Sequence, residues 1–266
     1  MRKIFGLFII ILLVFGVSSC EGIKTYQDLD REFTTHLELV SNDYAEKVAY
    51  LNRLSTETLF SVVKIQKTSY FPYTSATGSG VIFTQDERYF YVLTNAHVIH
   101  ATNQANATYL VYDYQKNQYE ATLVAKDTSY DLAVLRITKG NLSIQNMTFA
   151  TLNPSVGARA AILGYPSEQA NAITIGRVKS YQSITIRDAI SDLIEVNFDV
   201  IVSDNPVKPG SSGSIVVNDA MQLIGILYAG NFEEGASTSR FSFSIPVEKV
   251  IEFLLEHGFM KKEDES

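Results

Sequence analysis

Residues 208–218 read Lys-Pro-Gly-Ser-Ser-Gly-Ser-Ile-Val-Val-Asn, a glycine-rich turn that leads directly into an apolar strand. Such a turn presents several backbone N–H groups on one side, and a serine within it can face a cleft as a nucleophile. We therefore take Ser212 as the candidate nucleophile. The backbone N–H groups of Gly210 and Ser212, with Ser211 between them, form the candidate oxyanion hole.

A serine nucleophile needs a base with a pKa of about 7 and a carboxylate that orients this base. His97 lies at the end of a predicted strand, in the stretch Leu-Thr-Asn-Ala-His-Val at residues 93–98. Asp131 directly precedes an apolar strand, so its side chain can point into a cleft. The chain order His, Asp, Ser is that of chymotrypsin, whereas the serine comes first in lipases and esterases. The sequence therefore predicts a catalytic triad of His97, Asp131 and Ser212.

Short apolar or alternating segments, separated by Gly, Asn, Asp and Ser turns, follow one another from residue 58 onward. They predict an all-β fold built as a barrel or a sandwich. The predicted strands cover residues 61–67, 79–84, 88–94, 108–114, 118–125, 132–138, 160–164, 173–180, 193–202, 214–218, 222–228 and 241–245. Pro246 stands where a helix would begin and Gly258 where it would end, so we expect a closing helix over residues 246–257.

From about residue 61 to residue 258 the sequence resembles the HtrA (Deg) branch of the trypsin-like serine proteases. The motifs that carry the resemblance stand in the family's order and spacing, at residues 78–82, 94–98, 131–135, 162–166, 176–180, 204–218, 223–226 and 241–246. The resemblance implies a chymotrypsin-like fold of two six-stranded antiparallel barrels packed side by side. It places barrel 1 at about 58–150, barrel 2 at about 151–245 and a tail at 259–266, with the active site in the cleft between the barrels.

The resemblance implies a serine endopeptidase that hydrolyses peptide bonds in unfolded or surface proteins through an acyl-enzyme. The alternative is a catalytically silent pseudo-protease that uses the same cleft to bind peptides. The chain departs from the family at Ser214 and Ile215, where glycine and proline are usual. Because it ends just after the closing helix, we expect no C-terminal PDZ domain.

The resemblance also suggests which residues select the substrate. Val207, five residues before the nucleophile, is expected to line the specificity pocket, with Tyr228, Ala229 and Gly230 as its facing wall. These positions carry no charge, and an Arg or Lys side chain in such a pocket would need an acidic partner. Asp204 is the nearest acidic residue, and we expect it to have a structural role. The predicted cleavage is after small or medium aliphatic residues, with Tyr228 narrowing the pocket.

The first 19 residues have the order of a secretory signal: Arg2 and Lys3, an apolar run over 4–17, and two small residues. The run is shorter than the ~20 residues that a membrane-spanning helix needs. The stretch Val-Ser-Ser-Cys at residues 17–20 resembles a bacterial lipobox, and Cys20 is the only cysteine. We therefore expect cleavage before Cys20 and lipidation of its sulfur. This predicts an extracytoplasmic protein anchored to the cell membrane of a bacterium.

Composition and charge narrow the range of partners. The formal net charge is −7, and it becomes −9 once residues 1–19, with two basic and no acidic side chains, are removed. An acidic chain of this kind is not expected to bind nucleic acid or anionic lipid through its surface. No His, Cys and carboxylate cluster has the spacing of metal ligands, so we expect no metal and no cofactor. His36, His100 and His257 are interpreted as surface or helix-end residues.

The segment 20–57 is predicted to be helical and to precede the protease domain at 58–258. Its apolar residues recur at steps of three and four, as Leu29, Phe33, Leu37, Val40, Tyr44, Val48 and Leu51. Asp43 and Glu46 suggest a helix break near residues 41–43. The apolar face either packs on the protease domain or makes the segment a spacer, a lid or a surface for homo-oligomer formation.

Overall fold

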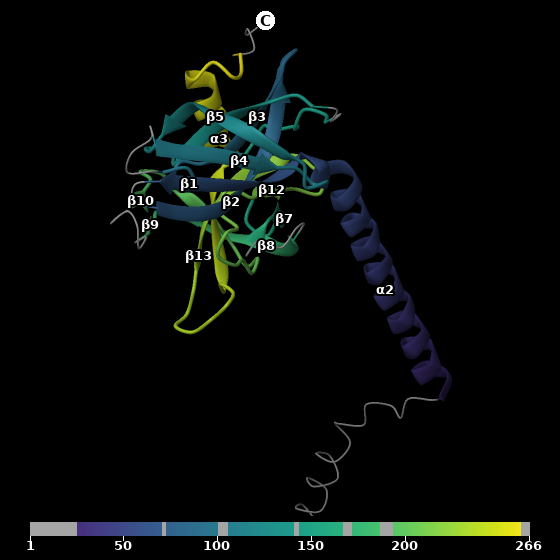
Figure 1. The fold of residues 1–266 in the computed structure, drawn as a ribbon. Coiled ribbons are helices and arrows are strands. Elements are labelled where there is room, and N and C mark those ends of the chain that lie inside the picture. The colour runs from purple at the N-terminus through teal and green to yellow at the C-terminus, as the bar shows by residue number, and fades with distance from the viewer. Residues whose placement is uncertain are drawn as a thin grey trace, which may run out of the picture. The chain divides into compact units, whose positions relative to one another are not determined.

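The computed structural model describes residues 26–70, 73–100, 106–140, 144–166, 172–186 and 194–261. Two closed six-stranded barrels make up most of it, and this confirms the predicted fold class. Figure 1 draws their strands as arrows. The predicted signal peptide, Cys20 and the last five residues of the predicted tail lie outside the described residues.

The first barrel is formed by β1 (Val62–Tyr70), β2 (Tyr73–Gln85), β3 (Tyr89–Asn95), β4 (Ala107–Tyr112), β5 (Gln118–Asp127) and β6 (Leu132–Thr138). The strand order is β1-β2-β3-β6-β5-β4, and β1 also pairs with β4, which closes the barrel. Its interior is filled by aliphatic side chains and Phe90, as expected of strands rich in β-branched residues. The most buried of them are Val63, Ile65, Ile82, Phe90, Val92, Ile99, Val111, Leu135 and Ile137.

The second barrel is formed by β7 (Arg159–Gly164), β8 (Ala172–Gln182), β11 (Val200–Ser203), β12 (Ile215–Val217), β13 (Leu223–Asn231) and β14 (Phe241–Pro246). The strand order is β11-β14-β13-β12-β7-β8, and β11 pairs with β8 to close it. Every residue of β11 and β12 is buried. Both faces of β12 are thus covered by other residues. This explains why residues 215–217 are all apolar.

The strand predicted over 193–202 is wrong as a single element. The structure has β10 at Ile194–Glu195, which pairs with β9 (Thr185–Ile186) in a separate two-stranded sheet, and then β11 from Val200. A bend at residues 197–198 separates the two. Asn197 and Asp199 flank Phe198 there, and Asn and Asp favour turns over continued strand pairing.

Helix α3 (Val247–Glu256) follows β14 directly and ends where the sequence indicated. Gly258 adopts a φ of 76°, the left-handed conformation that commonly terminates a helix. The chain then returns to the first barrel, where Phe259 packs against Phe83 and Tyr91 with ring centroids 6.0 and 5.5 Å apart. Phe253 on α3 lies 6.0 Å from the ring of Tyr130. Helix α3 and the residues after it thus contact the first barrel.

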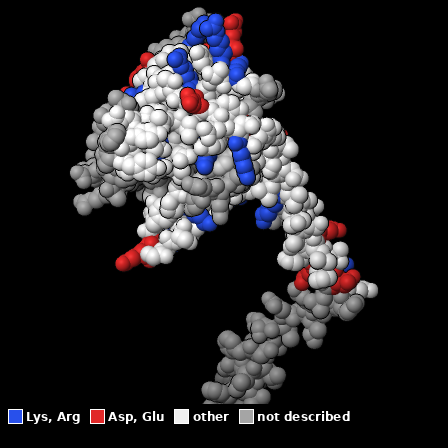
Figure 2. All heavy atoms as spheres, in the orientation of Figure 1, with Lys and Arg blue, Asp and Glu red and all other residues white. Residues whose placement is uncertain are grey.

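Helix α2 (Tyr26–Arg53) is continuous, so the break expected near residues 41–43 is not present. A π turn at Leu54–Thr58 and a 3-10 turn at Leu59–Ser61 follow it. From Phe33 to Leu51 the apolar side chains of its stripe are exposed, from 37% for Val48 to 70% for Tyr44. Acidic side chains of α2 gather toward its N-terminal end (Figure 2). Among the described residues, no helix is long and apolar enough to cross a membrane.

Candidate active site

The histidine and the aspartate are brought together because their strands are neighbours. β3 pairs with β6 so that Asn95 lies opposite Leu132, which places His97, two residues after β3, beside Asp131, one residue before β6. His97 Nδ1 lies 2.6 Å from Asp131 Oδ2, and the His97 backbone N–H donates to Asp131 Oδ1 at 2.8 Å. Both carboxylate oxygens are therefore occupied by the same histidine.

Asp131 is held from its backbone as well as its side chain. Its φ is 49°, in the left-handed region that aspartate tolerates better than most residues. Its carbonyl oxygen accepts hydrogen bonds from the Ala96 N–H at 3.0 Å and from Asn95 Nδ2 at 3.2 Å. The residue is 1% exposed. The carboxylate is thus fixed against Nδ1 of His97, which leaves Nε2 as the nitrogen available to act as a base.

Ser212 stands in the turn before β12. Gly210 and Gly213 have φ values of 87° and 85°, so the turn uses two glycines in conformations that other residues rarely adopt. The Gly213 N–H donates to the Leu227 carbonyl at 2.9 Å, which attaches the turn to β13. Ser212 Oγ donates to the carbonyl of Tyr228 at 3.5 Å. In the part of the chain that is described, no hydrogen bond joins Ser212 Oγ to His97.

Tyr228 connects the nucleophile to the base. Its carbonyl accepts from Ser212, and its ring meets the His97 ring edge to face, with the centroids 6.4 Å apart and the planes at 69°. Ser212 and His97 therefore both contact Tyr228, and Asp131 is bonded to His97. Catalytic hydrogen bonds are often long in a site without substrate and tighten when substrate binds.

The predicted oxyanion hole is supported by the hydrogen bonding of the turn. The N–H groups of Ser211, Gly213 and Ser214 donate to the carbonyls of Lys208, Leu227 and Ser211. The N–H groups of Gly210 and Ser212 have no acceptor among the described residues. Two backbone donors beside the nucleophile are thus available for an oxyanion. Ser211, which was also expected here, lies between them and does not offer its own N–H.

The departure at Ser214 is accommodated inside the turn. Ser214 is fully buried, and its hydroxyl donates to the Ser211 carbonyl at 2.6 Å. It faces Gly164, where an added Cβ would lie 1.7 Å from Ser214 Oγ. The extra side chain therefore fits because Gly164 leaves room for it, and it closes the turn behind the nucleophile.

Val207 and Gly230, two of the predicted specificity residues, face each other. A Cβ added to Gly230 would lie 2.8 Å from Val207 Cγ2 and 2.8 Å from Ser239 Cβ. Val207 and Ser239 are joined by two hydrogen bonds, at 2.8 and 3.1 Å. Ala229 is partly buried beside them. Val207, Gly230 and Ser239 are thus in contact, and none of them carries a charge.

The Tyr228 side chain does not narrow that space as expected. Leu227 pairs with Ser244 and Ala229 with Phe243, so Tyr228 is the extra residue of a β-bulge. A bulge re-aims a side chain, and here the ring is 1% exposed and turned toward His97. The bulk of the Tyr228 side chain therefore lies against His97.

Asp204 lies outside the pocket walls. Its Oδ2 is 2.6 Å from Lys179 Nζ, and its Oδ1 accepts from the Arg177 N–H at 2.6 Å. Partial burial opposes ionisation, but the bonds from Lys179 and Arg177 outweigh it and lower the pKa of Asp204. These contacts on β8 support a structural role.

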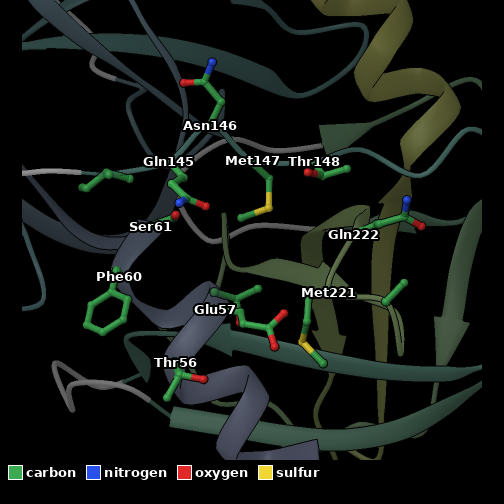
Figure 3. A pocket seen from close by; sticks show the side chains of 13 residues that line it. Thr56, Glu57, Phe60, Ser61, Gln145, Asn146, Met147, Thr148, Met221 and Gln222 are labelled. Carbon is green, nitrogen blue, oxygen red and sulfur yellow. The ribbon is translucent and has the colours of Figure 1, made fainter.

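Two hollows lie near this region. One, of about 240 Å³, is behind the nucleophile turn, where Pro206, Lys208 and Ser211 face the β7–β8 hairpin. The other, of about 490 Å³, is at the opposite end of β13 from Tyr228 and is drawn in Figure 3. It is lined by residues 56–58, 60–61, 144–148 and 220–222, with Met147 and Met221 among them. Neither hollow includes His97, Asp131 or Ser212.

The family model described as a trypsin-like peptidase domain matches residues 78–226. The serine protease Do-like HtrB of Bacillus subtilis is 31% identical over 185 residues, which are 68% of this chain and 39% of that protein. The serine endoprotease DegS of Haemophilus influenzae is 33% identical over 150 residues, which are 56% of this chain and 40% of that protein. The chain spans about two fifths of the length of these relatives.

Solved structures agree with this. The active form of the Rv3671c protease from M. tuberculosis aligns with a TM-score of 0.62 at 27% identity, over 77% of this chain and 84% of that one. An HtrA-type protease solved with a tripeptide aligns with a TM-score of 0.60 at 28% identity, over 79% of this chain and 64% of that one. The span of the family model, residues 78–226, contains His97, Asp131 and Ser212.

Proposed function

Because this chain belongs to the trypsin-like serine peptidases and is similar to their HtrA branch, we propose that it is a serine endopeptidase that acts on unfolded or surface proteins. The observation that carries the proposal is the combination of the His97–Asp131 pair with the two unpaired N–H groups beside Ser212. A peptide-binding role alone does not require either of them.

In the proposed reaction, Ser212 Oγ attacks the substrate carbonyl carbon and His97 Nε2 takes its proton. The negative oxygen that forms is stabilised by the N–H groups of Gly210 and Ser212. His97 then gives its proton to the leaving amine, and Asp131 stabilises the imidazolium in between. Water, activated by His97, hydrolyses the acyl-enzyme in the same way and frees Ser212.

The proposed substrate preference follows from the walls at Val207 and Gly230. We expect wild-type protein to cut unfolded casein mainly after Val, Ala, Ile or Leu, because a cation in this uncharged space would lose its hydration without a partner. One methylene more or less should change the preference by only ~1–3 kcal/mol. Mass spectrometry of the fragments checks this, with Ser212→Ala as the blank. A majority of cuts after Arg or Lys would contradict the assigned pocket.

The proposed location is the outer side of a bacterial membrane, with a lipid on Cys20. The support is the order of residues 1–20 and the lack of any other cysteine. Two or more acyl chains hold a protein stably on a bilayer, whereas one does not. Only residues 21–25 separate this anchor from the start of α2.

The proposed assembly is a homo-oligomer through the apolar stripe of α2. From Tyr26 the apolar residues recur at steps of 3, 4 and 4. This 11-residue repeat has a period of about 3.67 residues per turn, which keeps the apolar residues on one face of helices that wind around each other in a right-handed supercoil. The exposed members are Phe33, Leu37, Val40, Tyr44, Val48 and Leu51. Copies anchored at residue 20 leave the bilayer in the same direction, which favours parallel helices.

We expect Val40→Glu to dissociate this oligomer, because each copy would bury an unpaired carboxylate. Such a charge costs at least about 3 kcal/mol, or ~100-fold in affinity. Sedimentation velocity of the detergent-solubilised full chain measures the effect. Ala45→Glu adds the same charge to an exposed position off the stripe and should leave the oligomer intact. A wild-type monomer, or equal behaviour of both variants, would contradict the proposed assembly.

A further inference from the structure

One residue of the first barrel holds the nucleophile turn of the second. Ser79 lies on β2 and is fully buried. Its Oγ donates to the Gly210 carbonyl at 3.2 Å and accepts from the Tyr165 N–H at 2.9 Å. Its backbone N–H donates to the Ser212 carbonyl at 2.8 Å. Its own carbonyl accepts from Thr94 Oγ1 at 2.7 Å.

These bonds fall on both sides of an oxyanion donor. The Gly210 carbonyl belongs to the 210–211 peptide and the Ser212 carbonyl to the 212–213 peptide. The 211–212 peptide between them carries the Ser212 N–H, and the peptide just before them carries the Gly210 N–H. Peptide units are planar and neighbouring units share a Cα atom. Fixing the 210–211 and 212–213 units therefore restricts the 211–212 unit from both sides and the unit that carries the Gly210 N–H from one side.

The backbone around Ser79 is packed too closely to adjust. A Cβ added to Gly213 would lie 2.0 Å from the Ser79 carbonyl oxygen. One added to Gly164 would lie 2.8 Å from Ser79 Oγ, and one added to Gly78 would lie 3.3 Å from the Ser212 carbonyl oxygen. Three glycines thus let the two barrels meet at Ser79, and the hydroxyl is the only side-chain group of this residue that can bond across the contact.

We propose that Ser79 is a positioning residue that holds the oxyanion donors of the second barrel from the first. The proposal rests on the proposed peptidase function, since it concerns the same site. Its Oγ bond to Gly210 is the part that the side chain supplies, and the backbone bond to Ser212 remains in any variant.

Ser79→Ala tests this contribution. Loss of a direct oxyanion donor lowers kcat by ~10²–10³-fold, and Ser79 acts through the backbone, so we expect kcat to fall by ~10–100-fold with KM within about twofold. The affinity of a peptide boronate, which resembles the transition state, should fall by the same factor as kcat/KM. The affinity of a product peptide should not change.

Ser203→Ala is the matched control. Ser203 lies on β11, outside the nucleophile turn, and is also buried. Its hydroxyl is hydrogen-bonded to Ser242 Oγ on β14 at 2.7 Å. This variant removes a comparable buried hydroxyl, and we expect its kcat to stay within about threefold of the wild-type value. If Ser79→Ala does not fold, Ser79→Cys replaces it, because a thiol keeps the shape and weakens the hydrogen bond.

Amide hydrogen exchange separates this proposal from the proposed function. Exchange of the peptide covering residues 207–214 should rise in Ser79→Ala and stay at the wild-type level in Ser203→Ala, whether or not the protein is active. Unchanged exchange in that peptide would overturn the role of Ser79. So would a kcat within threefold of an active wild type. A wild-type protein that hydrolyses no peptide would instead overturn the proposed function, with the exchange result still deciding for Ser79.

Discussion

Ser212→Ala and His97→Ala should each lower kcat/KM by a factor on the order of 10⁴ to 10⁶. The first removes the attacking oxygen and the second removes the base, and residues that act as a unit give similar losses singly and together. Asp131→Asn should lower kcat by about 10⁴-fold, because an amide at this position favours the wrong histidine tautomer. Hydrolysis of an aliphatic peptide substrate and labelling by a fluorophosphonate probe measure these effects.

The stability of Ser212→Ala should stay close to that of wild type, because the Ser212 side chain makes a single long hydrogen bond, at 3.5 Å to the Tyr228 carbonyl. His36→Ala is the matched control: it removes an exposed histidine of α2 and should retain full activity. More than a tenth of wild-type activity in Ser212→Ala would contradict the assignment of the catalytic triad. An unlabelled, inactive wild type would favour the silent pseudo-protease, in which Ser212 remains bonded to the Tyr228 carbonyl.

Cys20→Ser should move the protein from the membrane fraction to the soluble fraction or leave it unprocessed. The free energy at stake is large, since each buried methylene contributes about 0.8 kcal/mol and a lipidated cysteine would insert at least two acyl chains. Fractionation and metabolic labelling with a fatty-acid analogue measure the change. Ser18→Ala keeps a small residue before the cysteine and should behave as wild type. Equal labelling of wild type and Cys20→Ser would refute lipidation at this position.

The barrels could be predicted from the sequence because apolar runs, turn residues and family motifs all indicate the same strands. His97 and Asp131 each stand beside the end of a strand, and their approach follows from the pairing of β3 with β6. The closing helix was equally readable, because Pro246 and Gly258 are strong local signals for a start and a stop.

Other features depend on contacts that local patterns do not encode. The direction of the Tyr228 ring is set by a one-residue bulge, and a bulge does not alter the composition of its strand. The hydrogen bond from Ser79 to the Gly210 carbonyl joins residues that are 131 positions apart in the sequence. At Asp43 a local capping signal was misleading, because the helical propensity of the neighbouring residues carried the helix through.

Residues after β14 connect the second barrel to the first. The Phe253 ring is buried against Tyr130 of the first barrel, and the Phe259 ring packs against Phe83 and Tyr91. Disordering either barrel therefore removes contacts from the other, and we expect the two to unfold as one cooperative unit. The proposed catalytic site needs Asp131 from one barrel and Ser212 from the other. We therefore expect the contacts of Phe253 and Phe259 between the barrels to help keep these two residues in place.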